Sequence, residues 1–351
     1  MINHHRALST LLIAMAGATG AQAGTSPLDA RTLIVTASNN VAANQLLVYS
    51  ATGTLLRQIP TQGQGGVSGN SGGIAQNHER LAVVNYTSGT VSVFWKEPER
   101  ASFRLETVLA AVANPVSVTF GSGHLYILST THVESHAIGA RGVAAAADGV
   151  AGLLHADGSA AQVGKLAGEL LITEKSNAIE SVALNAHGAV SGSAVSVANI
   201  PANVSAPFGL VTRGNEAYVS LAHNNEVSLV RHDTVLALGS TGTQNAPCWV
   251  SLDGPFLFTT NSPSHSISRF AVYGQVIVAD ALVAASFNGA PTDIDSRSGL
   301  AAVVDASGAV SHLSTLHIDE DGHLTAYGSA TIDSAATNGV LIVGREDRDE
   351  D

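Results

Sequence analysis

A short phrase recurs along this chain at a nearly constant interval. In each copy a proline or small residue is followed, three positions later, by an aliphatic residue at the start of an apolar stretch, as in Pro115–Val118 and Pro207–Leu210. We call the first residue of each copy an anchor. The seven anchors lie at residues 71, 115, 160, 207, 247, 291 and 337, so neighbouring anchors are 40 to 47 residues apart. A period in this range indicates a fold built from repeated units.

Each repeat also predicts further short strands. Apolar stretches such as Leu81–Val84 and Leu125–Leu128 follow the anchors, and a polar turn then leads to alternating stretches such as Thr90–Phe94 and Ser266–Phe270. Alternation with period two is typical of a half-buried strand, and the chain lacks the longer period of amphipathic helices. Three or four short strands in about 44 residues are typical of one propeller blade. The sequence therefore predicts an all-β, seven-bladed β-propeller.

The last repeat contains too few strands for a blade of its own. Gly339–Val343 is the single strand predicted after the seventh anchor, whereas three strands are predicted before the first anchor, at residues 32–36, 45–49 and 54–59. Pairing the C-terminal strand with these N-terminal strands would complete the seventh blade and remove the free edges of an open ring. We therefore expect one propeller domain over residues 24–344 and an acidic, solvated tail over residues 345–351.

The N-terminus has the pattern of a secretory signal peptide. A basic stretch to Arg6 precedes an apolar stretch over residues 7–18, and Ala21-Gln22-Ala23 gives the small-x-small cleavage pattern. The apolar stretch is shorter than the roughly 20 residues of a membrane-spanning helix. We expect residues 1–23 to be removed, the protein to be periplasmic or extracellular, and no segment to span a membrane.

Charge and cysteine content exclude several classes of protein. The chain has a formal net charge of −12 and 13% charged residues, without a basic run, which argues against nucleic-acid binding. Cys248 is the only cysteine, so an intramolecular disulfide is excluded, and we interpret it as a buried apolar residue. The chain has neither a phosphate-binding P-loop nor a Gly-x-Ser-x-Gly nucleophile motif. We expect no cofactor, and a monomer.

The predicted topology directs two sets of loops to the same end of the propeller. Each innermost strand runs away from its anchor and the second strand returns antiparallel, so the turn before the third strand lies beside the anchors. We call this end of the central channel the anchor mouth, and we expect a ligand there because function tends to lie on loops of rigid scaffolds. The residues predicted to bind it are Asn114, Gln162, Lys175, His223, Asn245, Asn261, Asp295 and Asn338, and the candidates for catalysis are Glu174 and Asp293. For each of them the alternative is a turn or capping residue that its own neighbours satisfy.

Two further features of the sequence could bind a ligand or a metal ion. The loop over residues 62–73 contains six glycines, so it could bring its backbone close to a ligand or serve as a flexible connection. His132 and His136 are four residues apart, which brings two side chains to one face only on a helix, and no helix is expected there. We therefore predict surface histidines and no metal site.

Several of these phrases resemble those of a known family. The stretches Ala246–Val250, Thr259–Asn261, Thr173–Lys175 and Asn85–Phe94 are similar to those of the lactonase-type seven-bladed propellers. That group includes 6-phosphogluconolactonase-like and carboxymuconate-cyclising enzymes. The resemblance covers roughly residues 31–343 and is closer to an exported branch without a settled activity. It implies the propeller fold and, for the enzymatic branch, chemistry on a lactone or sugar acid.

The chain departs from the enzymatic branch at positions that would carry catalysis. The resemblance implies a Pro-Arg-His phrase where this chain has Pro207–Gly209, and an Asn-Glu pair where the next strand ends in Ser220–Ala222. In the preceding blade Gln162 stands where the enzymes usually have a histidine. Lactone opening uses a cation near the developing oxyanion and a group that moves a proton, and the Phe, Gly, Leu and Ala found here supply neither.

Two hypotheses from different functional classes follow. The first, which the missing side chains favour, is a non-catalytic exported propeller that binds a small polyhydroxylated or carbohydrate ligand, or a protein partner, at the anchor mouth. The second is a hydrolase or isomerase acting on a lactone or sugar acid, supported by Glu174, Asp293 and Asp295. The geometry distinguishes them, because an enzyme needs an acid and a cation or histidine within reach of each other in one pocket.

Overall fold

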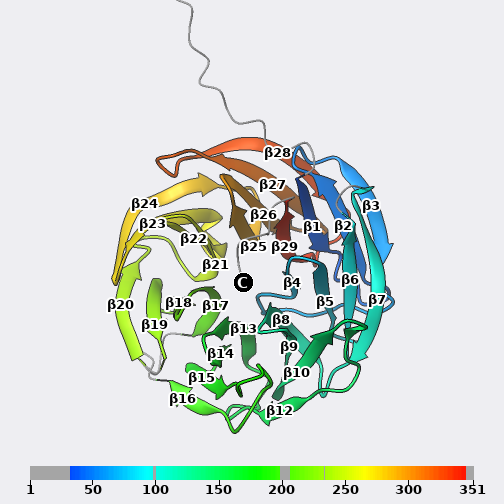
Figure 1. Cartoon of the computed structure of the whole chain (residues 1–351). Coiled ribbons are helices and arrows are strands. Elements are labelled where there is room, and N and C mark those ends of the chain that lie inside the picture. Colours follow the sequence, from blue (N-terminus) through cyan, green and yellow to red (C-terminus); the bar gives the residue numbers. More distant parts are fainter. Residues whose placement is uncertain (1–31, 98–99, 198–205, 233, 345–351) are drawn as a thin grey trace, which may run out of the picture.

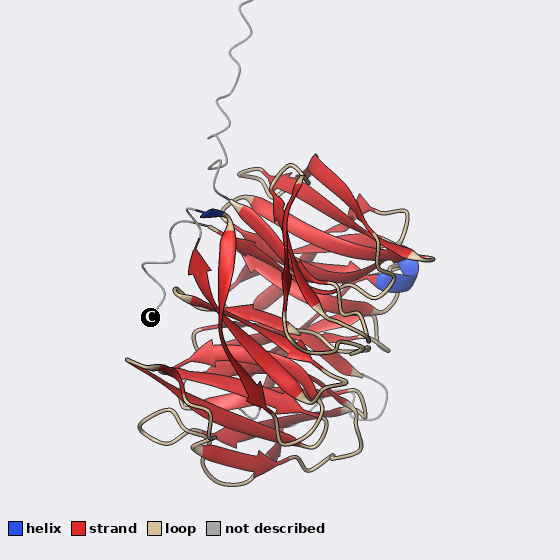
Figure 2. Cartoon of the chain, turned by 90° about the vertical axis from the view of Figure 1, so that its right-hand side faces the viewer, coloured by secondary structure: helices blue, strands red, loops and turns tan. Residues whose placement is uncertain are grey.

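Seven small sheets surround a central channel in the computed structural model, which describes residues 32–97, 100–197, 206–232 and 234–344 (Figure 1). In each sheet the strands pair antiparallel with their neighbours, so that one strand lies at the channel and the last one at the periphery. A view turned by 90° shows that the ring consists almost entirely of strands, with a short 3-10 helix at Ser262–Ser264 (Figure 2). The predicted seven-bladed β-propeller is confirmed.

Six blades are formed by strands that follow one another in the chain. From the channel outward, the first blade contains β4 (Ile74–Gln76), β5 (Arg80–Asn85), β6 (Thr90–Glu97) and β7 (Ser102–Ala110). The second blade contains β8 (Pro115–Gly121), β9 (His124–Ser129), β10 (His132–Gly139), β11 (Gly142–Val143) and β12 (Gly149–Gly152). The third blade contains β13 (Ala160–Leu166), β14 (Glu169–Glu174), β15 (Ala178–Ala183) and β16 (Val195–Val197). The fourth blade contains β17 (Pro207–Arg213), β18 (Glu216–Leu221), β19 (Glu226–Arg231) and β20 (Thr234–Ser240). The fifth blade contains β21 (Pro247–Asp253), β22 (Phe256–Asn261), β23 (Ser266–Tyr273) and β24 (Val276–Ser286). The sixth blade contains β25 (Ala290–Arg297), β26 (Leu300–Ser307), β27 (Val310–Ile318) and β28 (Leu324–Ile332).

The seventh blade joins the two ends of the described chain, as predicted. Its order is β29 (Asn338–Val343), β1 (Leu33–Ala37), β2 (Gln45–Ser50) and β3 (Leu55–Pro60). Strands β1 and β29 pair antiparallel from Leu33 opposite Val343 to Ala37 opposite Asn338. The ring is therefore closed by hydrogen bonds between strands about 300 residues apart.

The recurring phrase marks a β-bulge at the start of the innermost strands. The register against the second strand shifts directly after Pro115, Pro207, Pro247 and Pro291. Proline lacks an N–H to donate, so it suits a strand start, and a bulge bends the strand where the chain enters the channel wall. The repeat seen in the sequence is thus the local structure of a blade entrance.

The core lies between blades, because neighbouring blades cover both faces of each middle strand. Every residue of β5 and of β9 is buried. Most of the largest fully buried side chains, such as Tyr126, Tyr218 and Phe94, come from the second and third strands of blades. Burial of one such side chain contributes roughly 1.5–3 kcal/mol, so these contacts provide the main favourable term of folding.

The sequence left open how the Ala/Gly-rich stretch over residues 139–153 completes its blade. Strand β11 pairs with the C-terminal end of β10, at Ile138 and Gly139, whereas β12 pairs with its N-terminal half from His132 to Ser135. Two short strands therefore share the outermost position. The predicted signal peptide and the predicted acidic tail lie outside the described residues.

Candidate functional site

The anchors and the turns after the second strands meet at one end of the channel, as the topology predicts. Backbone N–H groups of Thr130, Lys175 and Ala222, in three such turns, donate to the carbonyls of Asn114, Ser159 and Ala206 beside the anchors. These short contacts hold the loops of each blade against its own entrance. The anchor mouth is therefore a real feature of the fold.

The glycine-rich loop between β3 and β4 occupies this mouth. Asn70 bonds to the opposite sides of the channel: its side-chain amide donates to the Val116 carbonyl at 2.6 Å, and its backbone carbonyl accepts the Trp249 indole N–H at 3.1 Å. The amide of Asn338 donates to the Asn70 side chain at 2.9 Å, and the Lys175 ammonium donates to the Gly69 carbonyl at 2.5 Å. The loop is thus bonded to four blades, three of them beyond the two that it connects, and reaches toward the centre of the ring (Figure 1).

Two glycines let the loop approach the channel wall this closely. Gly72 has φ of +64°, and a Cβ there would lie 2.8 Å from the Ser117 hydroxyl. A Cβ on Gly73 would lie 2.1 Å from the side-chain oxygen of Asn338. A larger residue at either position would clash, and at Gly72 it would also adopt an unfavourable backbone conformation. The loop itself therefore fills the space at the anchor mouth where the sequence predicted a ligand.

The two candidate catalytic acids are buried beneath this covered end. Glu174 is fully buried, and its Oε2 accepts the Ser159 hydroxyl at 2.8 Å while Oε1 has no partner among the described residues. Asp293 is 8% exposed and accepts the Ile294 N–H at 2.8 Å. Burial raises the pKa of each carboxyl to about 8. Neither acid lines the cavity described below.

The eight predicted ligand-binding residues separate into four groups. Asn261 is fully buried and donates to Ser266 and Ser268, as a turn residue does. Lys175 and Asn338 bind the glycine-rich loop. Three further side chains are exposed at the anchor mouth and do not line the cavity, namely Asn114, His223 and Asn245. Only Gln162 and Asp295 line the cavity.

The positions that distinguish this chain from the enzymatic branch are filled by packing. Phe208 is 7% exposed and meets the Trp249 ring edge-on, with ring centroids 5.1 Å apart. A Cβ on Gly209 would lie 2.3 Å from the Cys248 carbonyl oxygen, so this position has no room for a histidine without a backbone shift. Leu221 is fully buried. This part of the wall is apolar core and carries no proton-transfer group.

A cavity of about 1420 Å³ lies in the channel on the other side of the glycine-rich loop. It extends from Gly72 and Gln162, at the loop, to exposed turn residues at the opposite end of the channel, such as Gly214 and Ser298. We call this end the turn mouth, because it is formed by the turns between first and second strands. All seven blades contribute to the wall. The predicted entrance and the observed cavity therefore lie at opposite ends.

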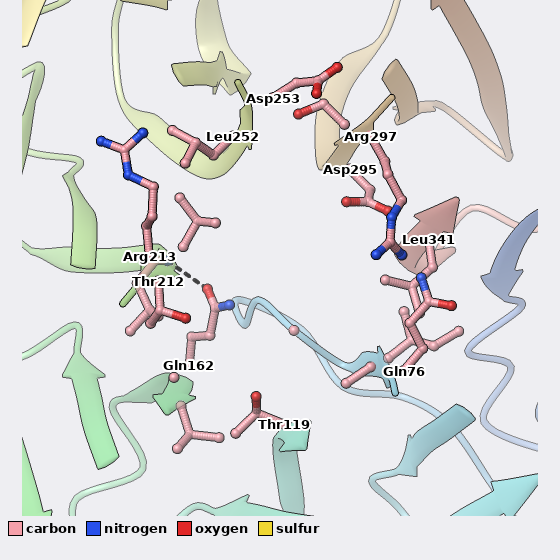
Figure 3. Close-up of a pocket in the computed structure, with 18 of the residues that line it drawn as sticks. Gln76, Thr119, Gln162, Thr212, Arg213, Leu252, Asp253, Asp295, Arg297 and Leu341 are labelled. Atoms are coloured by element: carbon pink, nitrogen blue, oxygen red, sulfur yellow. Dashed lines mark hydrogen bonds between the residues drawn. The ribbon is translucent and has the colours of Figure 1, made fainter. Parts of the chain in front are cut away.

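Polar side chains face each other across this cavity (Figure 3). Gln162 and Thr212 lie on one wall, and Asp295 and Arg297 lie on the wall opposite. The Gln162 side-chain oxygen accepts the Leu210 N–H at 2.7 Å, and Asp295 Oδ2 accepts the Ile342 N–H at 2.7 Å. These bonds fix both side chains to the backbone of a neighbouring blade, so the wall is preorganised.

Three charged residues at the turn mouth were not predicted from the sequence. Arg213, Asp253 and Arg297 line the cavity, and each stands six positions after a proline anchor, at Pro207, Pro247 and Pro291 respectively. The repeat contains this signal, because equal offsets within a repeat place residues at equal heights on neighbouring blades. Gln76 and Thr119 also line the cavity, five and four positions after their anchors, and Thr212 and Asp295 respectively have the same offsets.

Electrostatics distinguish the acids of the cavity from ordinary surface carboxylates. Burial raises the pKa of Asp295 to about 6, although the Ile342 N–H and the positive charge of Arg297 lower it. Burial also raises the pKa of Asp253, opposed by the N–H groups of Gly299 and Ser298 and by Arg297. The cavity therefore contains two carboxyl groups, and the guanidinium of Arg297 lowers the pKa of both.

Other candidate chemistry receives little support. Burial raises the pKa of the Cys248 thiol to about 12, so it is a poor nucleophile at neutral pH. Within the described ranges, no group of three or more His, Cys, Asp or Glu side chains is placed to hold a metal ion. None of the helices in the described part of the chain is long and apolar enough to cross a membrane.

Comparisons with known proteins support the fold. No family model and no curated protein matches the chain. A candidate 6-phosphogluconolactonase of Bacteroides fragilis has a similar structure, with 16% identity and a TM-score of 0.66 over 92% of this chain and 100% of that one. A second candidate 6-phosphogluconolactonase, from Bacteroides uniformis, has 15% identity and a TM-score of 0.64 over 89% and 100%. Virginiamycin B lyase from Staphylococcus aureus has 14% identity and a TM-score of 0.53 over 74% and 84%. At these identities the likeness shows that the chain has the fold of lactonase-type propellers, and no more.

Proposed function

We propose that this protein is an exported, non-catalytic binding protein that takes a small polyhydroxylated ligand into the central cavity through the turn mouth. The observation that carries the proposal is the cavity wall itself, where Gln162 and Thr212 face Asp295 and Arg297. Hydroxyl groups both donate and accept, so they suit a wall that presents an amide, a hydroxyl, a carboxylate and a guanidinium. Export rests on the sequence of residues 1–23 alone.

The composition of the wall supports a ligand that is polar at its rim and less polar at its ring faces. Apolar side chains such as Ile74, Val118 and Leu210 lie between the polar ones. Ligand pockets commonly combine such an apolar body with a few fixed polar groups that orient the ligand. The cavity is also larger than the roughly 300–1,000 Å³ of a typical small-molecule site, so it has room for an oligosaccharide end.

Replacement of Asp295 by asparagine is expected to weaken binding of such a ligand at least tenfold. The change keeps an oxygen for the Ile342 N–H but removes the charge that accepts hydroxyl hydrogens, and a hydrogen bond to a charged group is worth about 1.5–3 kcal/mol. Isothermal titration calorimetry against aldonates, aldonolactones and neutral sugars would measure the dissociation constants. His223→Ala, an exposed change at the anchor mouth, is the matched control and should leave them unchanged. Absence of binding across the panel, or weaker binding in the control alone, would overturn the proposal.

Lactone hydrolysis is the second candidate function, and one observation favours it. Asp295 and Arg297 place an acid and a cation on the same wall of one cavity. Glu174 and Asp293 are buried and do not line this cavity. With a lactone bound, water would attack the carbonyl carbon and pass its proton to the Asp295 carboxylate. Arg297 would stabilise the oxyanion, and the ring C–O bond would then break as the leaving oxygen takes the proton.

The pH dependence of this activity follows from the pKa of Asp295. A base with a pKa of about 6 gains its active, ionised form as the pH rises through that value, so enzyme-dependent acid release in a pH-stat should increase from pH 5 to pH 7. Spontaneous opening is subtracted, and aldonolactones and muconolactones are the substrates. Asp295→Asn should abolish the release. Release that persists in this variant would exclude Asp295 as the base, and no release from the wild-type protein would leave the binding function alone.

A further inference from the structure

Exposed apolar side chains gather on one outer strand. Within residues 273–283 the side chains of Tyr273, Val276, Val278, Leu282 and Val283 are all exposed, with Val276 53% and Val278 50% accessible. Leu238, on the neighbouring outer strand β20, adds to the same side of the ring (Figure 1). The other exposed large apolar residues of the described chain are scattered over several blades. A cluster of this kind on a soluble fold marks a surface for association.

Four of these side chains, Val276, Val278, Leu282 and Val283, lie on a strand at a sheet edge. Strand β24 is the outermost of its blade and, with 11 residues, the longest of the described chain, and its second side has no strand partner among the described residues. It consists largely of Val, Ile, Leu and Ala. Natural proteins usually protect such edges with charges, prolines or short strands, since a free edge pairs readily with another chain. Here the single charge is Asp280, which the Arg269 guanidinium already binds at 2.8 Å.

The hairpin between β23 and β24 determines which backbone groups are free. Tyr273 and Val276 pair across the two-residue turn Gly274-Gln275, so the N–H and C=O of Val276 point toward β23. Successive residues alternate, and Ile277 and Ala279 therefore present these groups at the outer edge. The register is regular over Val276–Ala279 and shifts only beyond it. A regular edge with free donors and acceptors thus lies beside the exposed valines.

We propose that two copies of this protein associate through their β24 edges, antiparallel about a two-fold axis at Ile277. This pairing lets each Ile277 exchange N–H···O=C bonds with its counterpart and places Val276 of one copy against the partner's Val278, in an isologous contact. The edge suits a second copy, because the same strand turned about a two-fold axis offers the matching donors and acceptors. Each chain carries a net charge of −12, but the copies would meet where little of it lies, since Asp280 is the only charged residue between 270 and 292.

The oligomeric state tests the proposal directly. A pair of edge strands buries less than the roughly 800 Å² per partner of a standard interface, so we expect a weak dimer that forms only at high protein concentration. Sedimentation equilibrium of the purified full chain, from 1 to 300 μM, should show a mass that rises from one to two copies. Val276→Lys with Val278→Lys should keep the mass at one copy throughout, because the lysines of the two copies would face each other and repel.

A matched variant controls for general effects of added charge. Val150→Lys with Val195→Lys changes two exposed valines on the outer strands β12 and β16 and should leave the dimer intact. Both double variants change exposed positions, so their thermal midpoints should stay near that of the wild type, which confirms that each is folded. A wild-type mass of one copy at 300 μM, or a dimer that survives in the β24 variant, would overturn the proposal.

Discussion

A chain that ends at Thr337 is expected to lose its cooperative folded state, because it lacks β29. Val340, Ile342 and Val343 are each at most 3% exposed, and they pack in the core clusters on the two sides of the seventh blade. Their burial contributes roughly 1.5–3 kcal/mol each. The sum approaches the net stability of about 5–15 kcal/mol of a typical domain, before the lost backbone pairing with β1 is counted. Urea unfolding followed by circular dichroism should show no cooperative transition.

The matched control is a chain that ends at Gly344. It keeps β29 and all its contacts with β1, and removes only residues 345–351. Its urea midpoint should equal that of the full chain. The shorter chain should also elute as aggregates, since β1 then exposes a buried, apolar edge from Leu33 to Ala37. A cooperative transition at the full-length midpoint in the chain ending at Thr337 would show that β29 does not close the ring.

Glu174→Gln is expected to stabilise the protein in alkaline solution by on the order of a few kcal/mol, since each unit of raised pKa is worth about 1.4 kcal/mol, and to have little effect near pH 4. Burial raises the pKa of Glu174 from its ordinary 4.5 to about 8 in the folded protein. The folded state therefore holds a proton that the unfolded state releases above pH 4.5, so this group makes stability fall as the pH rises from 4.5 to 8. Glutamine stays neutral and removes this loss.

Urea midpoints measured at pH 4 and pH 8.5 would test this linkage. The difference in unfolding free energy between variant and wild type should grow between the two values, and Asp293→Asn should behave in the same way, because burial raises its pKa from 3.8 to about 8. Glu320→Gln removes a negative charge from an exposed position and should change stability equally little at both pH values. If Glu174→Gln lowers the midpoint at pH 8.5, the buried carboxyl is needed in its charged form.

The repeat made the fold predictable in detail, because each blade obeys the same local physics. Proline anchors, apolar middle strands and polar turns lie at matching positions, and six of the seven innermost strands begin within one residue of their anchors. Closure of the ring by Asn338–Val343 and the N-terminal strands followed from counting strands. Only β4, which begins three residues after Ser71, departs from this pattern, since the end of the glycine-rich loop takes up those residues.

The candidate site was predicted far less well, because it depends on contacts between blades. Of the predicted residues, Gln162 and Asp295 line the cavity, whereas Glu174 and Asp293 lie buried away from it. The sequence marked the polar residues of the anchor mouth but held no sign of which loop would cover it. Arg213, Asp253 and Arg297 shared an offset in the repeat and could have been found by comparing blades.

By itself, then, the sequence determined the blade, the number of blades and the closure, since these follow from short-range patterns of proline, apolar and turn residues. Only the tertiary structure decided which end of the channel is open. The bonds of Asn70 to Val116, Trp249 and Asn338 join residues 46 to 268 positions apart, and no local pattern specifies such a meeting. The glycines that permit this approach were visible in the sequence, but what they approach was not.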